Sequence, residues 1–204
     1  LMESILRPFA GQTGLSVLDV GCGYGTHLAA AAKLGWKCFG VEPSAHARGV
    51  ALERLGGAAY IVETPTDLIP HEFDVVLLLD VIEHLTSPFP TFYQLFSIGA
   101  ITEKTVVVIA TPNAASVEAQ ENPATWPYRH PASHLVHYTA AALTHFLCRL
   151  HFSAPEIRGF APDTRSSEDL SKSAGLLVTA QGSDFAEFMR ERYVPGTWSK
   201  IAEY

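Results

Sequence analysis

The sequence of 204 residues contains few charged residues, and basic residues are the scarcer kind. Charged residues make up 17% of it, with 14 Lys and Arg against 21 Asp and Glu, so the formal net charge is −7. Because proteins bind the phosphate backbone of nucleic acids mainly through Lys and Arg, we do not expect a nucleic acid to be the main partner. Apolar residues make up 48%, which excludes a disordered chain and is enough for a substantial core.

Cysteines and long apolar runs are also scarce. Cys22, Cys38 and Cys148 cannot form a closed set of disulfides and include no C-x-x-C pair, which favours a reducing compartment. No apolar run approaches the roughly 18 residues that span a bilayer. We therefore predict no membrane span and a cytoplasmic protein. Leu1 precedes Met2, which is consistent with a fragment of a longer protein, so protein partners stay open.

Strand-like and helix-like segments alternate along most of the chain. Apolar or β-branched runs predict strands at 16–20, 37–41, 59–62, 73–79, 105–110, 156–160 and 176–180. Apolar residues at helical spacing predict helices at 2–9, 26–34, 45–55, 89–96, 143–150 and 185–189. We therefore predict a single α/β domain over residues 1–204, with a doubly wound, mostly parallel, Rossmann-like sheet. Ligands of such sheets bind beyond the carboxyl ends of the strands, so we expect the chemistry to lie in the residues just after each strand.

A glycine-rich loop follows the first predicted strand. Glycines stand at 21, 23 and 25, where they allow a close backbone approach to a ligand. A dinucleotide-binding loop would place its third glycine at 26, which is Thr26 here. Asp19 precedes the loop by two residues, and its carboxylate would repel a pyrophosphate but suits a cationic ligand. These features argue against the NAD-dependent oxidoreductase that a similar sheet could support.

Two further acidic segments follow later strands. Glu42 ends the second predicted strand, 23 residues after Asp19, where an acid can accept both hydroxyls of a ribose. Residues 80–85, after the strand at 73–79, read D-V-I-E-H-L. Together with the glycine loop, these segments resemble the class I S-adenosylmethionine-dependent methyltransferases. The D-V-I-E-H-L wording is most similar to the branch that contains ubiquinone-biosynthesis O-methyltransferases and bacterial small-molecule and glycan methyltransferases.

The resemblance implies a fold, a cofactor and a set of binding residues. It implies a last strand that runs antiparallel, S-adenosylmethionine as methyl donor and S-adenosylhomocysteine as product. In this family the residues after the first four strands hold the cofactor, here Asp19, Gly21, Cys22, Gly23, Tyr24, Glu42, Pro43, Thr64, Asp80 and Val81. The amino-acid end of the cofactor would lie at Asp19 and the glycine loop, and its ribose at Glu42. Thr64 stands where the family often has an acid for the adenine, while nearby Asp67 is either that contact or the cap of a turn.

Histidines cluster late in the chain, and two functions compete for them. His134 or His137 could be a general base that takes the proton of an acceptor hydroxyl. Alternatively, Glu83 and His84 could hold a divalent metal together with either His134 or His137. His84 could also take part in catalysis. A packing or capping role for His134 and His137 is a third interpretation.

Residues 111–138 are too long and too irregular for an ordinary connection, and we predict a lid or acceptor-binding insertion there. Within it, Trp126, Tyr128 and Arg129 could line a pocket for a ring compound, a sugar or an anion. The resemblance and these aromatics favour O-methylation of a small molecule or of a glycan. The alternative from another class is a methyltransferase-like binding module that has lost turnover.

Overall fold

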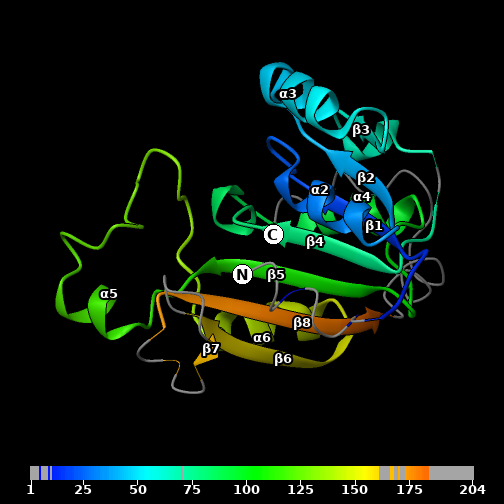
Figure 1. The fold of residues 1–204 in the computed structure, drawn as a ribbon. Coiled ribbons are helices and arrows are strands. Elements are labelled where there is room, and N and C mark those ends of the chain that lie inside the picture. The colour runs from blue at the N-terminus through cyan, green and yellow to red at the C-terminus, as the bar shows by residue number, and fades with distance from the viewer. Residues whose placement is uncertain are drawn as a thin grey trace.

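The fold of the chain is seen in a computed structural model, which describes residues 5, 9, 11–69, 71–160, 166–167, 170 and 173–183. These residues build one sheet with the strand order β3-β2-β1-β4-β5-β8-β6-β7 (Figure 1). The strands are β1 (Ser16–Val20), β2 (Lys37–Val41), β3 (Ala59–Val62), β4 (Val75–Leu79), β5 (Val106–Pro112), β6 (Phe152–Phe160), β7 (Ser166–Ser167) and β8 (Gly175–Ser183). The helices are α2 (Thr26–Lys33), α3 (Ala45–Leu55), α4 (Phe89–Ser97), α5 (Val117–Glu121) and α6 (Ala140–Arg149), with short 3₁₀ turns η2 (Pro65–Asp67) and η3 (Ile82–His84).

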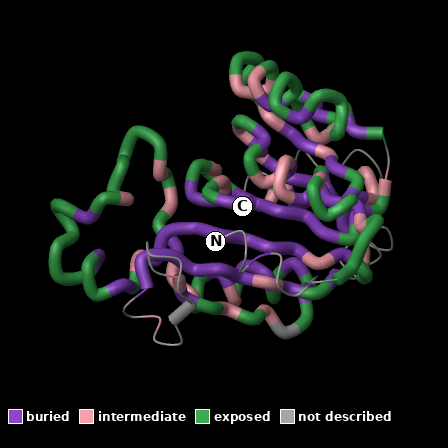
Figure 2. Tube along the Cα trace, in the orientation of Figure 1, coloured by how far each residue is buried: buried purple, intermediate pink, exposed green. Residues whose placement is uncertain are grey.

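The central strands are buried on both faces, as their continuous apolar sequences predict. Every residue of β1 and β4 is buried (Figure 2). On one face the core joins apolar side chains of the sheet to α4 and α6, and on the other face it joins them to α2 and α3. Helices on both faces of the sheet give the doubly wound arrangement that the sequence predicts.

The direction of the strands confirms the predicted sheet. The first five strands pair in parallel, β3 with β2, β2 with β1, β1 with β4, and β4 with β5. β8 then pairs antiparallel to both β5 and β6, which is the antiparallel strand implied by the family resemblance. β6 begins at Phe152, four residues earlier than predicted, and the helices predicted at 2–9 and 185–189 lie largely or wholly outside the described residues.

The segment 111–138 extends from the carboxyl end of β5 and is mostly exposed (Figures 1 and 2). Its sequence shows no helical period, yet it contains the short helix α5. The prediction missed α5 because a helix of five residues is too short to show a period. The side chain of Ser116 begins this helix by accepting a hydrogen bond from the backbone N–H of Ala119. None of the helices in the described part of the chain has the length and apolar character that crossing a bilayer requires.

Candidate functional site

The glycine loop packs tightly against the ends of two other strands. The backbone N–H groups of Gly21 and Cys22 both donate to the carbonyl oxygen of Val41, at 2.7 and 3.1 Å. Gly21 has a φ of 72°, and a Cβ atom there would lie 2.6 Å from a methyl carbon of Val81. Position 21 therefore requires glycine, because a side chain there would keep the loop from approaching the end of β4. The ends of β1, β2 and β4 meet at this point.

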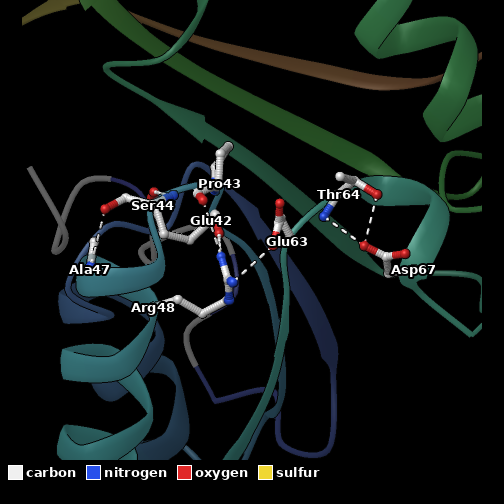
Figure 3. Close-up of polar contacts among 8 residues, drawn as sticks. All are labelled: Glu42, Pro43, Ser44, Ala47, Arg48, Glu63, Thr64 and Asp67. Carbon is white, nitrogen blue, oxygen red and sulfur yellow. Dashed lines mark hydrogen bonds and ion pairs between the residues drawn. The ribbon is translucent and has the colours of Figure 1, made fainter.

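Glu42 ties the end of β2 to the glycine loop. One carboxylate oxygen accepts a hydrogen bond from the backbone N–H of Gly23 at 2.9 Å, and the other accepts from that of Ser44 at 2.7 Å. Arg48 fixes the same corner from α3, since it donates to the carbonyl oxygen of Glu42 and pairs with Glu63 (Figure 3). An ionised carboxylate accepts up to about four hydrogen bonds, so Glu42 keeps acceptor capacity for a ligand hydroxyl.

Thr64 and Asp67 hydrogen-bond to each other and cap the start of the turn η2. The backbone N–H and the hydroxyl of Thr64 donate to the same carboxylate oxygen of Asp67, at 3.1 and 2.9 Å (Figure 3). The carboxylate thus satisfies the start of the turn η2, which supports the interpretation of Asp67 as a cap. An adenine contact by Thr64 stays a prediction.

The other residues predicted for the cofactor lie around the same loop. Cys22 is buried, and burial raises the pKa of its thiol to about 12, so the thiol is neutral at physiological pH. Tyr24 is exposed and meets the ring of His46 edge-on at 6.3 Å between ring centroids. Pro43 is exposed, and its carbonyl oxygen accepts a hydrogen bond from Arg48.

Asp19 is a buried carboxylate without a complete set of partners. Only 1% of the residue is exposed, and its Oδ2 has no hydrogen-bond partner in the described part of the chain. Nδ1 of His27 lies 3.7 Å from this oxygen, which is too far for a hydrogen bond. Burial, as the largest cause, raises the pKa of Asp19. An unpaired buried oxygen at the end of β1 fits a ligand that brings a positive charge or a donor.

A second group of polar side chains follows β4. Glu83 is only 1% exposed, its Oε2 accepts a hydrogen bond of 3.0 Å from the hydroxyl of Thr111, and its Oε1 has no partner among the described residues. Burial raises the pKa of Glu83 and also that of Asp80, which has a left-handed backbone with φ of 54°. The backbone N–H groups of Leu135 and Val136 donate to the carbonyl oxygen of Glu83 and so attach the 111–138 segment to this site.

Two histidines complete this group. Nδ1 of His84 lies 2.8 Å from the carbonyl oxygen of Ser133, and Nδ1 of His134 lies 2.8 Å from that of Tyr128. A carbonyl oxygen only accepts hydrogen bonds, so each Nδ1 carries the proton and each neutral ring keeps a lone pair on Nε2. The two ring centroids are 4.8 Å apart, and Glu83, His84 and His134 each offer a ligand atom within 4.8 Å of the others. We call these three residues the Glu83 triad.

His137 lies apart from the Glu83 triad. Its ring packs against that of Trp126 at 5.3 Å between ring centroids, and the residue is exposed. Of the two histidines that the sequence proposed, the structure brings only His134 next to Glu83 and His84. The spacing of residues along the chain could not make this choice, because it depends on how the 111–138 segment folds back.

A cavity of about 380 Å³ opens beside the Glu83 triad. It is lined by Asp80, Glu83, Pro112, Pro127, Tyr128, His130, His134, Phe160, Ala174 and Gly175. Tyr128 lies in this wall as the sequence predicts, whereas Trp126 is buried behind it and Arg129 is exposed and donates to the carbonyl oxygen of Pro123. Sequence reasoning missed Phe160 and Thr111, since neither belongs to a motif.

The strand order, the glycine loop and the acidic residues at three strand ends define a class I S-adenosylmethionine-dependent methyltransferase. The chain belongs to the methyltransferase domain family, whose model matches residues 1–153.

Individual relatives agree with this assignment. The chain is 40% identical over 90 residues to the ubiquinone biosynthesis O-methyltransferase of Paramagnetospirillum magneticum, which covers 41% of this chain and 34% of the relative. The match thus spans about a third of that curated relative. The small RNA methyltransferase HEN1 has a similar fold, with a TM-score of 0.69 and 18% identity over 89% of this chain and 24% of its own. Magnesium protoporphyrin IX methyltransferase from Synechocystis PCC 6803, solved with bound S-adenosylhomocysteine, has a TM-score of 0.63 and 16% identity over 89% of this chain and 82% of its own.

Proposed function

We propose that the chain transfers the methyl group of S-adenosylmethionine to a hydroxyl oxygen of a small uncharged molecule or sugar. The observation that carries this proposal is the Glu83 triad, which lies beside a cavity of about 380 Å³ at the end of β4. The names of the curated relatives also favour O-methylation. We further propose that residues 111–138 form the acceptor-binding insertion of a single domain.

The cofactor is proposed to bind across the ends of β1, β2 and β4. When bound, S-adenosylmethionine supplies a methyl group that its sulfonium has already activated. The unpaired oxygen of Asp19 would face the cationic amino-acid end of the cofactor, and Glu42 would accept from its ribose. Gly21 and Gly23 would leave room for its close approach to the backbone, Val81 would lie beside the glycine loop, and Thr64 would lie near its adenine.

The lining of the cavity favours an uncharged acceptor. Asp80 and Glu83 contribute carboxylates, and the lining residues include no Lys or Arg. An anionic acceptor would therefore meet two carboxylates and no Lys or Arg side chain, which is costly in a partly buried site. Pro127, Tyr128 and Phe160 present flat apolar faces that suit the ring of an aromatic compound or a sugar.

The donor atoms of the Glu83 triad fit a divalent cation. Two imidazole nitrogens and one carboxylate oxygen match Mn²⁺, Fe²⁺ or Zn²⁺ better than Mg²⁺, which prefers oxygen ligands alone. Such a cation would lower the pKa of an acceptor hydroxyl. The protein prepares these rings in advance, because the carbonyl oxygens of Ser133 and Tyr128 hold Nδ1 of each ring and leave Nε2 as the nitrogen that can bind a cation.

Asp80 is proposed to receive the proton of the acceptor hydroxyl. It lines the cavity, and its raised pKa makes its carboxylate a better proton acceptor than an ordinary aspartate. As the acceptor oxygen forms its bond to the methyl carbon, the carbon–sulfur bond breaks and S-adenosylhomocysteine leaves. The walls of the cavity would hold the oxygen in line with that bond, and such orientation can contribute roughly 7–11 kcal/mol.

Two measurements test the proposal in sequence. Calorimetric titration with S-adenosylhomocysteine, with NAD as the control, is expected to show binding of the first alone, and Glu42→Ala is expected to weaken it. Release of S-adenosylhomocysteine is then assayed with neutral mono-hydroxyl and vicinal di-hydroxyl ring compounds and sugars, before and after chelation and on addition of Mn²⁺ or Zn²⁺. Methylation that survives chelation would remove the cation from the proposal and leave Asp80 to take the proton without it. Binding without methylation of any acceptor would favour the binding module.

A further inference from the structure

We infer that His27 is an additional residue of the cofactor site, and that its protonated ring competes with the cationic amino group of the cofactor for the carboxylate of Asp19. The inference rests on the proposed position of the amino-acid end of the cofactor beside Asp19. It concerns a residue outside the glycine-loop motif, because His27 follows the last glycine of that loop, Gly25.

The turn between β1 and α2 places the His27 ring over Asp19. Gly25 has a φ of 71° and directly precedes α2, and His27 lies in the first turn of that helix. Nδ1 of His27 is 3.7 Å from Oδ2 of Asp19, and the two side chains are 27% and 1% exposed. The imidazole therefore stands between solvent and a carboxylate that is otherwise closed off.

Only one cation at a time can bind close to the carboxylate of Asp19. Its Oδ2 has no hydrogen-bond partner in the described ranges, so this oxygen attracts a nearby positive charge more strongly than it would in water. A protonated His27 is such a charge, and the amino group of the cofactor is another. Two cations beside one buried oxygen would repel each other, so protonation of His27 must weaken binding of the cofactor's amino group.

Other titratable groups surround Asp19 and His27, but they do not produce the same competition with the amino group of the cofactor. Glu42 adds negative charge that raises the pKa of Asp19, and Cys22 keeps its proton because its pKa is about 12. Burial raises the pKa of Asp80, at the end of the neighbouring strand, whereas His27, His84 and His134 act to lower it. A positive charge on His84 or His134 would therefore act mainly on Asp80. His27 is therefore the histidine that acts directly on Asp19.

The sign of the pH dependence follows from this competition. Histidine side chains change charge between about pH 5 and pH 8. Protonation of His27 puts a second cation beside Asp19 and lowers affinity for the cofactor, so affinity falls in acid. Binding at low pH must then release a proton. We expect affinity for S-adenosylhomocysteine to be about five- to tenfold lower at about pH 5.5 than at about pH 8.

Calorimetric titration with S-adenosylhomocysteine tests the inference on two substitutions of the same residue. His27→Gln stays neutral and is expected to keep the high affinity down to low pH. His27→Lys carries a fixed charge and is expected to show the low affinity throughout the range. His145→Gln, on the exposed side of α6, is the matched control and should follow the unchanged protein. 5′-Methylthioadenosine, which lacks the amino-acid part, should bind with little dependence on pH.

The outcomes separate this inference from the proposed function. If S-adenosylhomocysteine binds at no pH, the proposed cofactor site itself fails. If it binds, but His27→Gln keeps the original pH dependence, the titration belongs to Asp19 or to another group and the inference is overturned. An affinity that rises on acidification, as pairing of His27 with the cofactor's carboxylate would give, overturns it as well. Thermal melts of both variants show whether they are folded.

Discussion

The hydroxyl of Thr111 donates a hydrogen bond of 3.0 Å to Oε2 of Glu83, and both residues are closed to solvent. This bond joins the end of β5 to the loop after β4. It occupies one oxygen of the carboxylate and leaves Oε1 for the shared space with His84 and His134. Thr111 thus sets the orientation of the only carboxylate in the Glu83 triad.

Thr111→Val is expected to impair the site through Glu83. The loss of the hydroxyl leaves a buried carboxylate oxygen without a donor, which destabilises the fold by about 1–3 kcal/mol. It also frees the carboxylate to rotate, so affinity for Mn²⁺ should fall, as measured by calorimetry. Thr111→Ser keeps the hydroxyl and should restore that affinity even if the smaller side chain lowers the melting temperature. Equal Mn²⁺ affinities in the Val and Ser variants would contradict the positioning role.

Asp19→Asn is expected to make the protein more stable but a poorer binder of the cofactor. Because burial raises the pKa of Asp19, its ionised form is costly in the folded protein. This cost is complete above the raised folded-state pKa and fades as the pH falls toward the ordinary value. The variant should therefore gain about 1–2 kcal/mol in free energy of unfolding at neutral pH, and less in acid. Urea titrations at several pH values measure the gain, and a variant that is no more stable at neutral pH argues against it.

Much of the fold could be predicted because the signals are local. The strands β1, β2 and β3 occur at the predicted bounds, since each is an apolar run that ends at turn residues. The antiparallel direction of β8 is different, because it depends on which strands pair rather than on its own residues. That feature came from the family resemblance.

The candidate site was predictable only where it follows a motif. Glu42, Asp80 and Glu83 each follow a strand that the sequence shows clearly. The choice between His134 and His137 depends on how residues 111–138 return to Glu83, which no periodic pattern encodes. His27 was missed for a related reason, since its importance comes from the 3.7 Å approach to Asp19 and not from the motif.

His134 and His137, both in the 111–138 segment, should differ in their effect on kcat when each is replaced by asparagine. His134→Asn removes a member of the Glu83 triad and is expected to lower kcat by about 100-fold or more, with binding of S-adenosylhomocysteine unchanged. His137→Asn removes a ring contact with Trp126 and should change the melting temperature more than kcat. Steady-state kinetics and thermal melts of both variants check this. Equal losses of kcat would contradict the difference between the two residues, and full activity in both variants would return both to a structural role.

Gly21→Ala should close the cofactor site for a steric reason that a second substitution can relieve. The new methyl group would lie 2.6 Å from a methyl carbon of Val81, and the residue would keep a φ of 72° that disfavours alanine. The loop must then move away from the end of β4, so affinity for S-adenosylhomocysteine should fall by about tenfold or more. Val81→Ala removes the clashing atom but leaves the backbone strain of about 1 kcal/mol, so the double variant should recover part of the affinity. If Val81→Ala restores nothing, the close approach of the two strand ends is not what the glycine permits.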